Sequence, residues 1–166
     1  MRVSVLLVLV VLSSFPSCRW YTFTGGSVPV DAKTFSVSYF KVQASLADPN
    51  YGQQVTEGLK DLLLDQTRLN LADADGDLHY EGEVVRYQIL PVAASGDEIS
   101  TRNRLKVDVK VRYFNSLEPE KDKEVTLSQF EDFEASSNFD NVEDDLIESI
   151  NAKILQDIYD QTLGDW

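Results

Sequence analysis

The chain has 166 residues, a formal net charge of −13 and 43% hydrophobic residues. This length suits one domain, and the hydrophobic content is sufficient for a packed core. The acidic excess argues against nucleic acid as a partner, because phosphate binding needs clustered lysine and arginine, and also against simple electrostatic docking on anionic lipid.

The N-terminus has the pattern of a secretory signal. Met1 and Arg2 give a positive start, and residues 3–12 are apolar except for Ser4. A positive start, a short apolar run and small residues are typical of a cleaved signal peptide. The apolar run is much shorter than the roughly 20 residues of a membrane-spanning helix. We therefore predict a signal peptide over residues 1–17.

The only cysteine, Cys18, follows directly. Its position resembles a lipobox, in which the cysteine is acylated, for example with palmitate, and becomes the mature N-terminus. Ser17 fits this pattern, whereas Phe15 and Pro16 are unusual in it. A single cysteine cannot form an internal disulfide, so lipid attachment is predicted, and a plain buried thiol is the alternative. Two or more acyl chains hold a protein firmly on a membrane.

Residues 18–30 are predicted to form a lipidated tether, and residues 31–166 a single domain. The tether contains Trp20, Tyr21 and Phe23. Aromatic residues beside a lipid anchor can lie at the membrane interface or cap the core, and the sequence leaves both open.

The first elements of the domain follow from hydrophobic periodicity. Alternation predicts a strand over residues 34–40, with Phe35, Val37 and Tyr39 on one face. Asp48 as N-cap, followed by Pro49, predicts a helix that runs to about residue 66. Residues 73–76 then form a turn.

Three strands and a helix follow. Residues 78–92 predict a long strand, with a bulge or change of facing at Val84 and Val85. Residues 104–113 alternate most regularly, as a sheet with one buried face requires. A polar turn at 118–122 leads to a strand over 124–133. Asp140 is predicted to cap a helix up to about residue 163, with Glu143 completing a capping box and Gly164 ending the helix.

This order of strand, helix, three strands and helix predicts an α+β fold. The simplest arrangement is a two-layer sandwich with a four-stranded sheet and both helices on one face. The first strand–helix–strand unit allows a crossover, which would make the sheet mixed.

The sequence offers little for catalysis or metal binding. His79 is the only histidine, and its position among glutamates in a strand predicts a surface residue. The loop at Asp73, Asp75 and Asp77 suggests calcium, but its glycine is at position four, whereas an EF-hand loop requires it at six. We therefore expect no enzyme activity, no metal and no cofactor.

Basic residues share one face of the strand over 104–113. We define the basic strip as Arg102, Arg104, Lys106, Lys110 and Arg112. One interpretation is cross-strand pairing with glutamates such as Glu81, Glu83 or Glu124. The other is contact with an anionic ligand or a partner, for which the phosphates of a glycolipid would suit arginine and lysine.

Several stretches together resemble the lipopolysaccharide-assembly lipoproteins of the LptE type, in the branch with a short aromatic N-terminal tether. They span nearly the whole mature chain in order. The stretches are CRWYTFTG (18–25), DAKT (31–34), QTRL (66–69), GDLHYEGE (76–83), NRL (103–105), and VEDDL (142–146) through to the terminal Trp166.

The resemblance implies a non-enzymatic lipoprotein of the outer membrane that faces the periplasm. The family pairs with a large β-barrel translocon, LptD, and sits largely within its lumen as a plug, and the complex places lipopolysaccharide in the outer leaflet. The family fold is two helices on a four-stranded sheet. Some members bind lipopolysaccharide through basic residues, so Arg104, Lys106 and Lys110 are the candidates here, although no family motif maps onto them one for one. Because the chain is net negative, contact with the partner is the other use of these residues.

Two other functions stay open. A stand-alone lipoprotein that binds a small ligand or acts as a chaperone would be monomeric in mild detergent and carry its own pocket. A periplasmic hydrolase has the least support, because one histidine and scattered carboxylates supply no recognisable set of catalytic roles.

Overall fold

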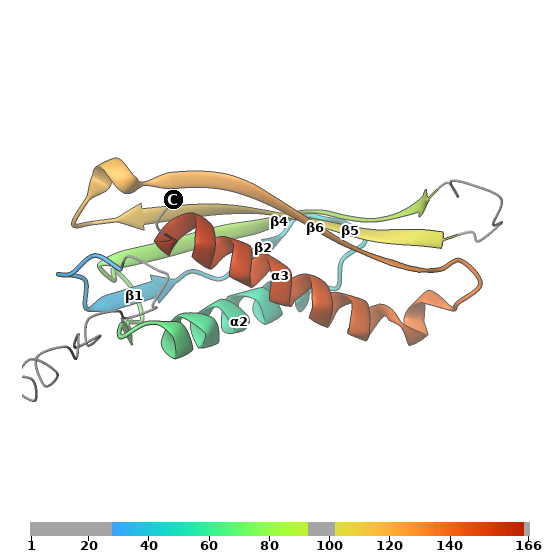
Figure 1. Cartoon of the computed structure of the whole chain (residues 1–166), viewed down its shortest axis with the longest axis horizontal. Coiled ribbons are helices and arrows are strands. Elements are labelled where there is room, and N and C mark those ends of the chain that lie inside the picture. The colour runs from blue at the N-terminus through green and yellow to red at the C-terminus, as the bar shows by residue number, and fades with distance from the viewer. Residues whose placement is uncertain (1–27, 93–101, 165–166) are drawn as a thin grey trace, which may run out of the picture.

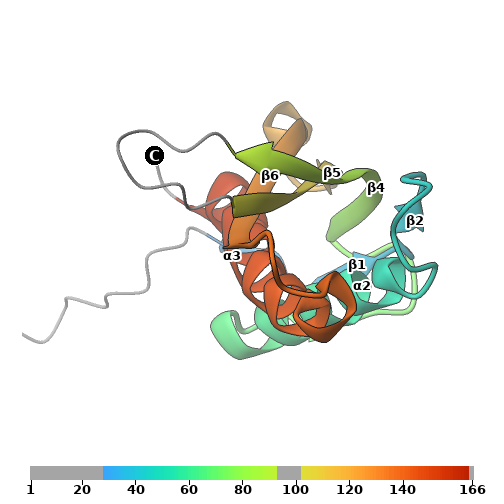
Figure 2. The same ribbon diagram turned by 90° about the vertical axis from the view of Figure 1, so that its right-hand side faces the viewer.

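The computed structural model of the chain describes residues 28–92 and 102–164. It is a two-layer α+β sandwich in which an open sheet packs on two helices (Figure 1). Both helices lie on the same side of the sheet, as the view along the strands also shows (Figure 2). The predicted fold class and the placement of the helices are therefore confirmed.

The sheet has six strands, whereas four were predicted. The strands are β1 (Thr34–Val37), β2 (Lys41–Val42), β3 (Asn70–Leu71), β4 (Leu78–Val92), β5 (Arg102–Asn115) and β6 (Lys123–Glu134). Their spatial order is β3–β1–β4–β5–β6, and β2 also pairs with β4. β1 and β2 run parallel to β4, while β4, β5 and β6 are antiparallel, so the sheet is mixed as predicted. The additional strands, β2 and β3, have two residues each, which is too short for an alternating pattern to show in the sequence.

The strand predicted over residues 34–40 is interrupted after Val37. Beyond that point Tyr39 turns outward and is 55% exposed, while Phe40 enters the core. A Cβ at Gly82 would lie 2.0 Å from the Phe40 ring, so the ring fills the space that a side chain on β4 would need. The Phe40 N–H donates to Thr56 Oγ1 of the neighbouring helix. The prediction that Tyr39 shares the core face was wrong because this packing ends β1.

The long strands follow the predicted alternation. Leu78, Tyr80 and Val84 of β4 are buried. The pairing of β4 with β5 shifts register between Val84 and Arg86, which is the predicted bulge. Because the bulge adds one residue, Arg86 turns to the face away from the helices.

Both helices begin after the residues predicted to cap them. Helix α2 (Tyr51–Gln66) has Asn50 as its N-cap, and Asp48 instead accepts a hydrogen bond from the Asn50 N–H. Helix α3 (Glu143–Leu163) has Val142 as its N-cap, because a short 3₁₀ turn, Phe139–Asn141, precedes it. Asp140 lies in that turn and does not cap α3. Glu143 accepts a hydrogen bond from the Tyr87 hydroxyl rather than closing a capping box.

The core lies between the helices and the inner face of the sheet. Ile150, Ile154 and Ile158 recur every four residues on α3 and are fully buried. Leu59 of α2 is also fully buried, and a Cβ at Gly58 would lie 2.8 Å from Leu155, so the two helices approach closely there. Burial of the apolar residues on this side leaves polar side chains to cover the other side of the sheet.

Candidate functional site on the outer sheet face

The outer sheet face is the side of β4, β5 and β6 that points away from the helices. It is built from alternate residues of each strand, so the strand register decides which side chains meet. In this register Arg112 lies between Glu81 and Glu124, and Lys110 lies opposite Glu83. The structure places all five residues of the basic strip on this face.

Each residue of the basic strip lies within ion-pair distance of a carboxylate. The pairs are Arg102–Glu134 (3.5 Å), Arg104–Asp132 (2.6 Å), Lys106–Asp108 (3.8 Å), Lys110–Glu124 (2.8 Å) and Arg112–Glu81 (3.2 Å), with Glu83 at 3.8 Å from Arg112. All but the Lys106 pair cross between neighbouring strands. Cross-strand pairing, the first of the two interpretations, is therefore present, and it includes the three glutamates named from the sequence.

Arg104 makes the closest of these contacts. Its Nε and Nη2 donate to the two carboxylate oxygens of Asp132 at 2.6 and 2.9 Å. This bidentate bond lowers the pKa of Asp132 and raises that of Arg104, because it favours both charged forms. The Arg104 guanidinium also lies 3.7 Å from the centre of the Phe130 ring, which is 43% exposed. Arginine and an aromatic ring thus meet at the surface.

Asp108 is the buried charge of this face, with 6% of its surface exposed. Its carboxylate accepts hydrogen bonds from Arg86 Nη1 at 2.5 Å and from Ser128 Oγ at 2.7 Å. These contacts join β4, β5 and β6 in one row across the sheet. A buried carboxylate requires such partners, because an unpaired charge is costly to remove from water.

The outer sheet face is electrically balanced. Six basic side chains, namely the basic strip and Arg86, meet six acidic ones. The acidic residues are Glu81, Glu83, Asp108, Glu124, Asp132 and Glu134. Each residue of the basic strip is therefore paired with a carboxylate, and the face as a whole is neutral. The strip is not an isolated cationic patch.

Several members of this site were not identified from the sequence, among them Arg86, Asp132 and Phe130. Arg86 joins the face only because the bulge changes the facing of β4. Phe130 and Asp132 have the same parity as Glu124 on β6, which pairs with β5 without a register shift. Extending the period of two along β6 from Glu124 would have placed both residues on the outer face.

His79 is half-buried at one end of this face. Its Nδ1 lies 2.7 Å from Ser36 Oγ and its Nε2 lies 3.5 Å from Glu81 Oε1, while its ring stacks on Phe114. These neighbours superficially resemble a catalytic triad. However, Ser36 is 1% exposed and its hydroxyl already accepts the Gly76 N–H, so this oxygen is enclosed and engaged. We read the group as packing between β1 and β4.

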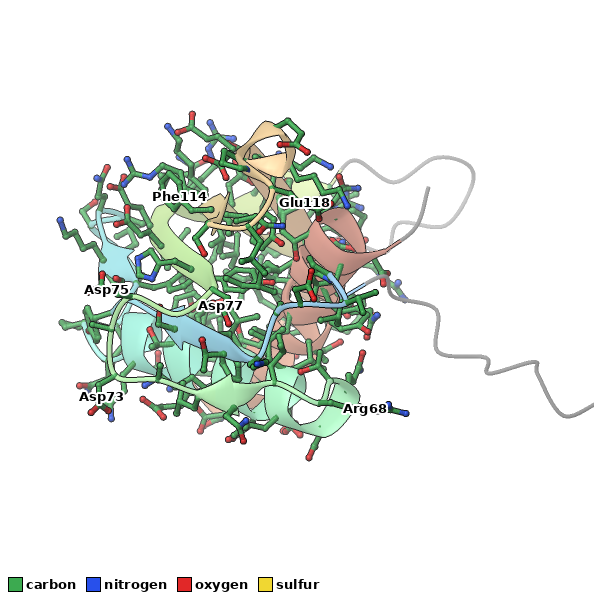
Figure 3. The ribbon with its side chains drawn as sticks, turned by 90° about the vertical axis from the view of Figure 1, so that its left-hand side faces the viewer. Arg68, Asp73, Asp75, Asp77, Phe114 and Glu118 are labelled. Atoms are coloured by element: carbon green, nitrogen blue, oxygen red, sulfur yellow. The ribbon has the colours of Figure 1, made fainter. Side chains whose placement is uncertain are left out.

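The aspartate loop holds β1 in place. Figure 3 shows Asp73, Asp75 and Asp77 along this loop at one end of the molecule. Asp77 accepts hydrogen bonds from the Lys33 N–H, the Thr34 N–H and the Thr34 hydroxyl, which lower its pKa. Asp75 adopts a φ of 51°, which a turn tolerates in aspartate. Within the described ranges, no three histidine, cysteine or acidic side chains gather as metal ligands.

The predicted signal peptide, Cys18 and the aromatic tether residues lie outside the described residues. In the part of the chain that is described, no helix has the length and apolarity needed to cross a membrane.

The fold and this face define a class of protein: a two-layer α+β domain whose sheet presents a broad, charge-paired surface. Comparison with known families matches residues 32–162 to LptE, described as lipopolysaccharide-assembly. Since the match covers most of the chain, the protein belongs to the LptE family, a family of non-enzymatic lipopolysaccharide-assembly lipoproteins. No curated protein sequence matches the chain significantly.

Solved structures share the fold at low sequence identity. Protein XCC0632 from Xanthomonas campestris has a TM-score of 0.54 and 9% identity, with 83% of this chain and 89% of that chain covered. Lipoprotein B from Nitrosomonas europaea has a TM-score of 0.51 and 13% identity, with coverages of 84% and 86%. Protein CT253 from Chlamydia trachomatis has a TM-score of 0.51 and 10% identity, with coverages of 79% and 98%. At these identities the similarity concerns the fold.

Proposed function

We propose that this protein is an outer-membrane lipoprotein subunit of the lipopolysaccharide transport machinery. In this proposal, lipid on Cys18 anchors it, the domain faces the periplasm, and it pairs with and plugs a large LptD-like β-barrel. It performs no catalysis and needs no cofactor. The observation that carries the proposal is the family match over residues 32–162, on a fold with both helices on one side of the sheet.

The outer sheet face is the surface that we assign to the partner. Besides its charges it exposes apolar side chains, among them Leu90 and Phe130, which flank Arg104 across β4 and β6. Arginine and aromatic residues are enriched in protein–protein interfaces. Fixed charges of both signs on one face provide a pattern that a complementary protein surface can recognise.

Direct capture of an anionic glycolipid is the less favoured use of the basic strip. A phosphate would have to replace or share carboxylates that already bind these residues, and the face has no net positive charge to attract it. This balance supports contact with a protein partner.

The first test is native co-purification. The protein, tagged at its C-terminus, is extracted from outer membranes in mild detergent, and the proteins that elute with it from a sizing column are identified. A large β-barrel at one-to-one stoichiometry is the expected result. A lone, monodisperse lipoprotein would contradict the proposal and favour the stand-alone ligand-binding or chaperone function instead.

Charge reversal tests the assigned surface. Arg104→Glu with Lys106→Glu is expected to reduce barrel association and weaken the outer-membrane barrier. Lys60→Glu with Lys153→Glu is the matched control, since it makes the same change in net charge on helices α2 and α3 and also replaces two basic residues that form ion pairs. Normal association and a normal barrier in the first variant would exclude this role of the strip.

A charge swap separates partner contact from internal pairing. Arg104→Asp with Asp132→Arg keeps both charges but exchanges their positions. If the Arg104–Asp132 pair only stabilises the sheet, the swapped protein should associate with the barrel as the wild-type protein does. We expect the swap to restore thermal stability more fully than barrel association, because a partner reads the position of each charge.

Lipid attachment is tested by the intact mass of the mature protein extracted from membranes. The proposal predicts a chain that begins at residue 18 and carries the added mass of acyl groups. An unmodified mass would contradict it.

A further inference from the structure

A hollow of about 350 Å³ lies on the surface where the segment before β1 meets the C-terminal end of α2. Val28 and Ala32 line one side of it, and Thr67, Arg68 and Leu69 line another. Tyr159 of α3 completes the wall. Its volume is at the lower end of the range for sites that hold a small ligand or a large side chain.

The chemistry of this hollow suits a flat aromatic ring. Leu69 and Tyr159 are 4% and 7% exposed, so they form an apolar base, and the buried Tyr159 hydroxyl has a raised pKa because of that burial. Arg68 stands at the rim and points away from the ribbon (Figure 3). Among the residues that the structure describes, Arg68 forms no ion pair. A guanidinium without a carboxylate is available to stack on an aromatic face.

The position of the preceding chain identifies a candidate occupant. Val28, the first described residue, already lines the hollow, and Phe23 lies only five positions before it. Five extended residues span at most about 17 Å, so Phe23 is confined to the neighbourhood of the hollow, and Trp20, eight positions before Val28, can lie at most about 28 Å away. Gly25 and Gly26 stand between them and Val28, and glycine pairs favour tight reversals of the chain.

We propose that the hollow receives an aromatic side chain from residues 20–23, so that the membrane tether folds back and is held against the ends of α2 and α3. The contact would fix the distance and orientation of the domain relative to its lipid anchor. This inference does not depend on the identity of the partner, and it selects the core-capping role over the membrane-interface role for these aromatic residues.

The test is intramolecular photo-crosslinking in the full-length, lipidated protein in its own membrane. A photoreactive benzoylphenylalanine replaces Trp20, Tyr21 or Phe23, one position in each chain, and crosslinked peptides are mapped by mass spectrometry. We expect at least one position to crosslink to residues 66–69 or to Tyr159 within the same chain. Crosslinks from all three positions only to lipid or to other proteins, or no crosslink to the hollow at all, would overturn the proposal.

Three controls make the result specific. The same probe at Trp166 tests the competing occupant, and a crosslink from Trp166 alone to the hollow would also overturn the proposal. Arg68→Ala is expected to reduce the yield by roughly two- to five-fold, the change that corresponds to a cation–π contact at an exposed site. Because Arg68 is exposed, this variant leaves the core untouched, whereas Ala32→Phe fills the hollow and should abolish the crosslink.

Discussion

The helix layer and the outer sheet face carry charge in different ways. Helices α2 and α3 together hold nine acidic residues and two lysines, whereas the outer sheet face holds six residues of each sign. Of the formal net charge of −13, the two helices therefore contribute −7 and the outer sheet face contributes nothing. Net charge therefore bears on what the helix side can bind, whereas on the outer sheet face the position of each charge decides which partner fits.

The two regions also differ in what stabilises them. The helices are held by buried aliphatic side chains, whose contribution depends on apolar area and changes little with salt. The outer sheet face is held by ion pairs and hydrogen bonds, most of them partly exposed, whose contribution falls as ionic strength rises. Perturbing one region at a time should reveal this difference.

The largest effect is expected for Ile154→Ala on α3. Ile154 is fully buried between the helix and the sheet, and removing such a side chain costs about 2–5 kcal/mol through lost burial and a residual cavity. Urea unfolding should show this loss equally at low and high salt. Ala152→Ser, at an exposed position of the same helix, is the control and should change stability little. A loss below about 1 kcal/mol for Ile154→Ala would show that α3 is not anchored as described.

A smaller effect is expected for Asp108→Ala on the outer sheet face. This change leaves Arg86 and Ser128 without their shared acceptor and should cost about 1–3 kcal/mol. Ser128→Ala removes one of the two hydrogen bonds and should cost less. Equal losses for the two variants would mean that the Arg86 contact contributes nothing.

A still smaller effect is expected for the exposed pair of Lys110 and Glu124. A double-mutant cycle with alanine at both positions should give a coupling of about 0.2–1 kcal/mol. In 1 M salt, where the screening length is about 3 Å, the coupling should shrink. A coupling that is unchanged by salt would contradict the account of this face as electrostatically held.

Acid should weaken the sheet through three carboxyls whose pKa values are lowered in the fold: Asp77, Glu131 and Asp132. The folded state binds protons less readily than the unfolded state, so the stabilisation is complete above the unfolded pKa values of 3.8 and 4.5 and is lost as pH falls below them. Thermal melts between pH 6 and about pH 3 should show this loss. Asp77→Asn, which removes one of the groups, should make the dependence on pH shallower, and an unchanged slope would count against the Asp77 contribution.

Local periodicity was enough to predict the long elements. The alternation along residues 104–113 and the four-residue repeat of isoleucines on α3 both arise from burial of one face, so they are visible in the sequence. The capping residues and the break after Val37 were not predictable in this way. They depend on contacts between distant residues, such as Phe40 over Gly82 and Tyr87 with Glu143.

For the same reason, only part of the candidate site could be predicted from the sequence. The basic strip follows from alternation within one strand, but its partners come from β4 and β6, so their identity depends on strand order and on the bulge at Val84. Strand order is set by tertiary packing, which one sequence does not reveal. The pairing of Arg104 with Asp132 and Phe130 therefore became evident only in the structure.

Site-specific photo-crosslinking in intact cells can show directly whether the outer sheet face contacts a barrel partner. A photoreactive residue replaces Thr126, which is exposed on β6 and lies opposite Lys110 on the outer sheet face. The matched probe replaces Asp61, which is exposed on α2. We expect the probe at Thr126 to crosslink to a large outer-membrane β-barrel. Absence of a barrel crosslink from Thr126, with or without one from Asp61, would contradict the assignment of the outer sheet face as the partner surface.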